Sequence, residues 1–184
     1  MNRQSFLALL LLACFSYADD SESIHSPRSV SIIHGPVFNS STGNTYYLLS
    51  EASWDESQAF CVANGGNLVT INDEEENNWL LATFLAVLPE YNNFWTGFSD
   101  QVVEGVWVWI SGEPVTYTNW APGQPDDAGG EDYCWLIGVN YPEYKDWNDV
   151  PNTGLLPWGS PNGILEIEGM HLAPSTWGSI KSIQ

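Results

Sequence analysis

The sequence predicts an α+β domain in which two helices precede a set of short strands. Two observations favour this fold class: helix-capping patterns stand near the start of the domain, and runs of aromatic and β-branched residues between polar loops follow them. The length of 184 residues suits one domain with a sizeable core. A content of 43% hydrophobic residues, with ten Trp, excludes a disordered acidic chain.

The first helix is expected after Ser53, because Ser53 and Glu56 have the spacing of a capping box. It should end at the glycine pair 65–66. The second helix is expected after Asn72 as its N-cap, with acidic residues in the positively polarised first turn. Apolar residues then recur at helical spacing: Trp79, Leu80, Phe84 and Leu88.

The strands are expected in segments rich in aromatic and branched residues: Tyr46–Leu49, the alternating stretch Val106–Trp109, Tyr133–Ile137 and Ile164–Ile167. Two long loops, residues 121–132 and 140–162, are rich in Gly, Pro, Asn and Asp. The expected domain therefore combines short strands with long irregular loops.

The N-terminus has the pattern of a signal peptide, with Arg3 ahead of the unbroken apolar run Phe6–Phe15. This run is about half of the roughly 20 residues that a membrane-spanning helix needs, so no transmembrane segment is expected. An alternative is a lipoprotein signal that anchors the chain at a surface through Cys14. The expected order is a signal peptide, a flexible tether, a domain and a C-terminal tail, over residues 1–18, 19–42, 43–168 and 169–184.

The charge balance excludes nucleic acid as a partner. Four Lys and Arg residues against 23 Asp and Glu residues give a formal net charge of −19, which repels phosphate backbones. Many oxygen ligands lie in or beside the loops: Asp100, Glu104, Gln124, Asp126, Asp127, Glu131, Asp132, Asn148 and Asp149. Carboxylates gathered there would repel one another unless a cation lies between them.

Calcium is the expected cation. The three histidines (His25, His34 and His171) lie in the flanking segments, and neither Cys61 nor Cys134 has a second thiol at metal-ligand spacing, which disfavours zinc. Oxygen ligands on flexible loops suit Ca²⁺ better than Mg²⁺. The spacing is not that of an EF-hand, so separate segments would have to supply the ligands. A solvated acidic surface without an ion is the alternative.

Six ordered motifs resemble the C-type lectin domain across about residues 43–167. They are Ser53–Ser57 with Cys61, Gly65–Leu68, Trp95–Phe98, Gly123–Asp126, Glu131–Asp132 and Trp147–Asp149. The resemblance implies a C-type lectin-like fold, with two helices, small antiparallel sheets and long calcium-binding loops. It also implies a binding protein rather than an enzyme. No histidine for a catalytic triad and no Gly-x-Ser-x-Gly or His-Glu-x-x-His motif occurs in the domain.

The resemblance implies two calcium sites. Its principal calcium ligands correspond to Gln124, Asp126, Glu131, Asn148 and Asp149, with Pro125 in the cis form. The ligands of a second, loop-ordering calcium correspond to Asp100, Glu104, Asp127 and Asp132. Sugar hydroxyls would replace water on the principal ion, and the Gln-Pro-Asp order implies galactose-type sugars.

Two departures from the family pattern affect these expectations. The turn after the tripeptide, residues 127–130, has no aromatic residue to stack on a sugar, and Trp158 is the candidate substitute. Cys61 matches the family's first cysteine, but Leu165 stands at the position of its usual partner. Tyr133 stands at another cysteine position of the family, and Cys134 follows one residue later. Two buried free thiols are therefore expected, with a Cys61–Cys134 bridge as the alternative.

The expected function is that of a secreted, calcium-dependent lectin that favours galactose-type glycans. The alternative is a calcium-stabilised module that binds a protein or another non-sugar surface ligand. The sequence sets no oligomeric state for either function.

Overall fold

The computed structural model describes residues 29–88, 92–138, 144–154 and 160–169. Two helices, α1 (Trp54–Ala63) and α2 (Glu74–Leu85), lie beside a sheet. The strands in the described residues are β1 Ile32–Phe38, β2 Thr45–Glu51, β3 Asn67–Leu68, β4 Asn93–Ser99, β5 Val108–Trp109, β6 Tyr133–Ile137, β7 Trp147–Val150 and β8 Asn162–Ile167. These elements confirm the α+β class.

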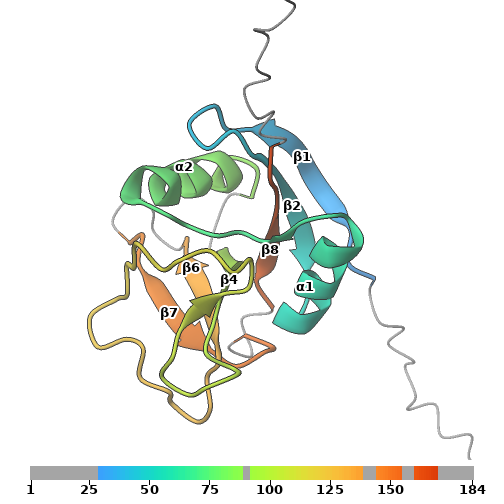
Figure 1. The fold of residues 1–184 in the computed structure, drawn as a ribbon. Coiled ribbons are helices and arrows are strands. Elements are labelled where there is room, and N and C mark those ends of the chain that lie inside the picture. Colours follow the sequence, from blue (N-terminus) through green and yellow to red (C-terminus); the bar gives the residue numbers. More distant parts are fainter. Residues whose placement is uncertain (1–28, 89–91, 139–143, 155–159, 170–184) are drawn as a thin grey trace, which may run out of the picture.

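The strands form one connected sheet rather than separate small sheets. Its order is β1-β2-β8-β4-β6-β7, with β3 paired to β8 and β5 paired to β4. The β4–β8 pair is parallel and the other pairs are antiparallel. Figure 1 shows α1 and α2 beside β2 and β8, and the long loops around β4, β6 and β7 at the end away from β1. The central strand β8 thus joins the helical half of the domain to the loop half.

The capping box expected at the first helix is confirmed. The Ser53 hydroxyl accepts from the Glu56 backbone N–H at 3.3 Å, and the Glu56 carboxylate accepts from the Ser53 N–H at 3.0 Å. The N-cap expected at the second helix is wrong by one residue. Asp73, rather than Asn72, accepts from the Glu76 N–H at 2.8 Å, because Asp73 is the residue with the extended backbone that an N-cap needs.

Four strands, β1, β3, β4 and β7, lie outside the segments expected to form strands. Strand β1 lies within residues 19–42, which were expected to form a tether without structure. It is an edge strand paired only to β2, and most of its side chains are exposed, so backbone pairing forms it without an alternating apolar pattern. Strand β7 lies within a segment expected to be a loop, and it forms through antiparallel pairing with β6. The short strand β3 was not expected.

Three buried tryptophan indoles donate hydrogen bonds that connect separate elements of the core. The Trp54 indole donates to the Thr96 carbonyl at 2.8 Å, and the Trp95 indole donates to the Ala52 carbonyl at 2.9 Å. The fully buried Trp147 donates to the Asn77 side chain of α2 at 2.7 Å. Strand β7 is therefore anchored to α2 at the residue that precedes Asn148 and Asp149.

Both cysteines in the described residues are buried and free, as expected. Cys61 packs in one core cluster with Leu165, and Cys134 packs in the other. Burial raises the pKa of the Cys61 thiol to about 12 and raises the pKa of Cys134 further, which favours the neutral form of both thiols. Within the described residues, neither helix has the length and apolar content needed to cross a bilayer.

Candidate metal and ligand site

The loop that follows Trp120 begins against β7. The Ala121 N–H donates to the Trp147 carbonyl at 2.9 Å, and the Trp147 N–H donates to the Asn119 carbonyl at 2.8 Å. Further along this loop, the peptide bond between Gln124 and Pro125 is cis, as expected. The buried strand β7 therefore sets the starting point of the loop that contains the Gln-Pro-Asp tripeptide.

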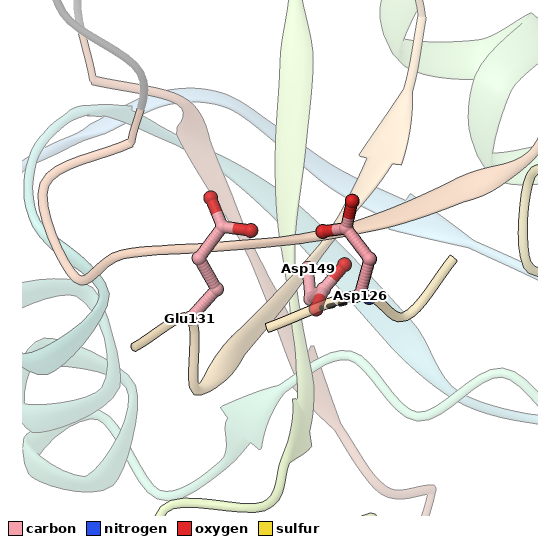
Figure 2. A group of neighbouring side chains, drawn as sticks. All are labelled: Asp126, Glu131 and Asp149. Carbon is pink, nitrogen blue, oxygen red and sulfur yellow. Dashed lines mark hydrogen bonds between the residues drawn. The ribbon is translucent and has the colours of Figure 1, made fainter. Parts of the chain in front are cut away.

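Three carboxylates converge at this end of the sheet. Asp126, Glu131 and Asp149 each offer an oxygen, and these oxygens all lie within 4.8 Å of one another. Figure 2 shows the Asp126 and Glu131 carboxylates facing each other, with Asp149 beside Asp126. Asp149 is fully buried and Glu131 is 7% exposed, whereas Asp126 is exposed. The group is therefore buried at Asp149 and Glu131 and exposed to solvent at Asp126.

Backbone donors hold the carboxylates in place. The Oδ2 atom of Asp149 accepts from the N–H groups of Asp126 at 2.9 Å and Asp127 at 2.8 Å. Glu131 accepts from the Ala128 N–H at 3.2 Å, and its own N–H donates to Asp127 Oδ1 at 3.0 Å. The sequence did not point to these N–H groups as part of the site, because any residue type provides one.

Two side-chain oxygens of the expected calcium ligands lack hydrogen-bond partners. The Oδ1 atom of Asp149 and the Oε1 atom of Gln124 are both buried, and neither has a donor within the described part of the chain. A buried acceptor without a donor costs about 1–3 kcal/mol, so native structures rarely leave one without compensation. Both atoms belong to residues expected to bind calcium, and coordination to a hard cation would compensate a buried oxygen of this kind.

The electrostatics of the group also favour a cation. Burial raises the pKa of Glu131, and the charges of Asp149 and Asp126 raise it further. Among the described residues, Lys145 is the only Lys or Arg, and it forms an ion pair with Glu74 of α2. The three carboxylates thus repel one another without a neutralising side chain, and a divalent ion would relieve that repulsion.

The second expected group is looser. Burial raises the pKa of Asp100, and the charges of Asp132 and Asp127 act in the same direction. Desolvation and the charge of Asp100 also raise the pKa of the exposed Glu104. Asp100 Oδ2 accepts from the Gly105 N–H at 2.9 Å, while Oδ1 is buried without a partner. These carboxylates share one region, but in the described residues only the first group forms a compact set of ligand oxygens.

Two expected site residues remain, Asn148 and Trp158, and only Asn148 lies within the described residues. Asn148 precedes Asp149 on β7, pairs with Trp135 of β6 and is half-buried. Trp158, the candidate for stacking on a sugar, lies outside the described residues. The expected position of Asn148 in a loop is thus corrected to a strand, whose pairing fixes its backbone.

The fold and the converging loop carboxylates define the class of the protein, and the sequence comparison agrees. The chain belongs to the C-type lectin family, because the model of the Lectin C-type domain matches residues 50–158. It is 36% identical over 155 residues to salivary C-type lectin 2 of Aedes albopictus, an alignment that covers 79% of this chain and 87% of that protein. It is 34% identical over 111 residues to a perlucin-like protein of Mytilus galloprovincialis, across 58% of this chain and 68% of that one.

Solved structures agree on the fold. The carbohydrate-recognition domain of the mouse scavenger receptor C-type lectin superposes with a TM-score of 0.58 at 31% identity, covering 74% of this chain and 97% of that chain. The C-type lectin CEL-I from Cucumaria echinata superposes with a TM-score of 0.60 at 21% identity, over 77% and 96% of the two chains, and shows the fold alone. The expected C-type lectin-like fold is therefore confirmed.

Proposed function

We propose that this chain is an exported, calcium-dependent lectin that binds galactose-type glycans, and that it is not an enzyme. The observation that carries the proposal is the convergence of the Asp126, Glu131 and Asp149 carboxylates, in which Asp149 Oδ1 is buried without a donor among the described residues. The three side chains of this group all offer carboxylate oxygens, which is the ligand chemistry of calcium. We propose Gln124, Asp126, Glu131, Asn148 and Asp149 as the calcium ligands.

The bound calcium would supply coordination positions for two neighbouring sugar hydroxyls. The carboxylates of Asp126 and Glu131 would accept hydrogen bonds from those hydroxyls. The amide groups of Gln124 and Asn148 would donate hydrogen bonds to the sugar oxygens. The order of amide and acid in Gln124-Pro125-Asp126 follows the galactose-type pattern of the family, and it supports galactose over mannose. The second group, Asp100, Glu104, Asp127 and Asp132, is proposed to bind a calcium that orders the loops.

The proposed location is outside the cell, because residues 1–18 have the features of a signal peptide. A surface form anchored through Cys14 is the variant of this proposal. A tether over residues 19–31, ahead of β1, and a tail over residues 169–184 remain parts of the proposed organisation.

A glycan array with and without a calcium chelator tests the function. The proposal expects binding to galactose-terminated glycans in calcium, and loss of that binding in the chelator. Asp149→Asn should abolish binding. Asp146→Asn is the matched control, since it makes the same chemical change nearby outside the ligand set, and it should leave binding intact. An array without any bound glycan in calcium would reject the proposal.

A second candidate function is supported by the exposed valines beside Asp100. Val102 is 87% exposed, Val103 is 55% exposed and Val106 is 54% exposed, on a segment whose backbone bonds to Asp100. An apolar patch of this kind suits a protein or another non-sugar ligand, with calcium needed only for loop order. In that case Asn148→Ala would leave ligand binding nearly unchanged, whereas the lectin proposal expects it to be lost.

A further inference from the structure

Two buried glutamates meet at one tyrosine hydroxyl, on elements that the proposed lectin function does not use. Glu76 of α2 is 4% exposed and Glu166 of β8 is 7% exposed. The hydroxyl oxygen of the fully buried Tyr46 on β2 lies 2.8 Å from Glu76 Oε1 and 3.0 Å from Glu166 Oε1. This trio joins α2 to the two strands at the helical end of the sheet.

The number of protons at this junction is limited. The Tyr46 hydroxyl has one proton, and that proton can satisfy only one of the two carboxylates fully. The Thr42 hydroxyl lies 2.9 Å from the same tyrosine oxygen, and it can donate to that oxygen. One of the two carboxylate–tyrosine contacts therefore lacks a proton unless a glutamate carries it.

The other donors do not supply that proton. The Asn72 N–H donates to Glu76 Oε2 at 2.9 Å, and the Thr70 N–H donates to Glu166 Oε2 at 2.9 Å. The Asn44 side chain donates to Glu166 Oε1 at 2.7 Å. These bonds hold both carboxyl groups in position, but none of them lies between the second carboxylate and the tyrosine oxygen.

The charges that face the pair are all negative. The charges of Asp73 and Glu113 raise the pKa of Glu76. Glu76 also lines a surface pocket, and Glu168 lines that pocket together with Asn44 and Asn72. Burial raises the pKa of Glu76, and burial raises the pKa of Glu166 to about 7, with the charge of Glu76 contributing to the latter. The only Lys or Arg in the described chain, Lys145, pairs with Glu74. In the part of the chain that the structure describes, no Lys or Arg side chain therefore offsets a doubly ionised pair.

We propose that Glu76 and Glu166 retain one shared proton at neutral pH, and that this proton makes the junction of α2 with β2 and β8 sensitive to pH. We call the trio of Glu76, Glu166 and Tyr46 the clasp. Loss of the proton leaves two negative charges around one buried tyrosine and loosens the clasp. Because the folded protein binds this proton more tightly than the unfolded chain does, the clasp stabilises the fold at mildly acidic pH. That stabilisation is lost as the pH rises through about 7. The same helix α2 carries Asn77, which holds Trp147 beside the proposed calcium ligands.

Thermal unfolding of the full chain from pH 5 to pH 9, in a chelator, tests the clasp. The wild type is expected to lose several degrees of Tm as the pH rises through 7. Glu166→Gln mimics the protonated carboxyl, so this variant should show a flatter profile and a higher Tm than the wild type above pH 8. Glu51→Gln, at an exposed position on β2, is the matched control and should follow the wild type. A Glu166→Gln profile parallel to that of the wild type would overturn the proposal.

A second measurement does not depend on how the variant folds. Infrared spectroscopy of the wild type at pH 6 should show the C=O stretch of a protonated buried carboxyl, and this band should decline as the pH rises through 7. Its absence throughout that range would mean that both glutamates are ionised, and it would overturn the proposal. Replacing Tyr46 with Phe should shift the pH at which the band declines, because the hydroxyl links the two carboxyl groups.

Discussion

The Oδ2 atom of Asp149 accepts a hydrogen bond from the backbone N–H of Asp126 at 2.9 Å. The bond ties the Gln-Pro-Asp turn to strand β7, which is fixed in turn by the buried Trp147. The other oxygen of the same carboxylate, Oδ1, is buried without a partner. One side chain thus positions the loop with one oxygen, while its second oxygen has no hydrogen-bond partner among the described residues.

Exchanging the amide and the acid of the tripeptide should change the sugar preference. The double variant Gln124→Glu with Asp126→Asn keeps the net charge of the site, so calcium binding is expected to persist. The positions of hydrogen-bond donor and acceptor are reversed, which should move the preference from galactose toward mannose by about tenfold, or roughly 1.4 kcal/mol. Competition binding with the two monosaccharides measures the ratio. A double variant that binds calcium and still prefers galactose would contradict the assignment of these two residues.

Calcium affinity should fall as the pH drops from 7 to 5. Burial and the charge of Asp149 raise the pKa of Glu131, so protons compete with the cation at a higher pH than for an ordinary glutamate. Without calcium, a carboxyl group with a raised pKa stabilises the fold at low pH, and that stabilisation is lost as the pH rises. The Tm increase caused by calcium should therefore be larger at pH 7 than at pH 5.

Glu131→Gln is the comparison for this pH effect. It should weaken calcium binding and reduce the dependence of that binding on pH, because the competing proton site is gone. A calcium affinity that stays constant between pH 5 and pH 7 in the wild type would argue against a role for Glu131 as a ligand.

A cysteine at position 165 should form the bridge that this chain lacks. Cys61 and Leu165 pack in the same buried cluster, and Cys61 is free. Under oxidising conditions, Leu165→Cys is expected to crosslink to Cys61 and to raise the free energy of unfolding by about 2–4 kcal/mol. Denaturant unfolding with and without a reductant measures the gain. The same variant with Cys61→Ser should show no gain, and a failure to crosslink would mean that the two positions do not face each other.

Asn77 should support the site without contacting a ligand. Its side chain accepts from the Trp147 indole at 2.7 Å and donates to the Lys145 carbonyl at 3.0 Å. Asn77→Ala leaves a buried indole N–H without an acceptor, which should lower the free energy of unfolding by about 1–3 kcal/mol. Calcium affinity should fall as well, because β7 loses its tie to α2. The neighbouring variant Asn78→Ala is the control, and an equal effect of both variants would contradict this role.

The sequence was informative where a local pattern has one physical solution. The Ser53 and Glu56 spacing specified a helix start, and the aromatic run Tyr133–Ile137 specified β6 to the residue. Strand β7 was missed because Trp147-Asn148-Asp149 is mostly polar, and its strand conformation depends on pairing with β6, which is distant in sequence. Strand β1 was missed for a related reason, since its exposed side chains show no alternation.

For the candidate site, residue type indicated which side chains belong to it but not how their oxygens are used. The acidic loop residues predicted a cation, and the structure brings three of them together: Asp126, Glu131 and Asp149. The division of Asp149 into one oxygen for the loop and one without a partner follows from the path of the backbone between residues 121 and 132, which no short pattern specifies.

Calorimetric titration of the chain with calcium chloride measures the proposed calcium binding, with Asp149→Asn and Asp146→Asn titrated in parallel. Saturable calcium binding is expected for the wild type and for Asp146→Asn. Asp149→Asn should lose the tighter class of sites, with an affinity reduced by at least about tenfold, or about 1.4 kcal/mol. A wild type that binds no calcium, or an Asp149→Asn variant that binds it as tightly as the wild type, would show that these carboxylates do not form a calcium site.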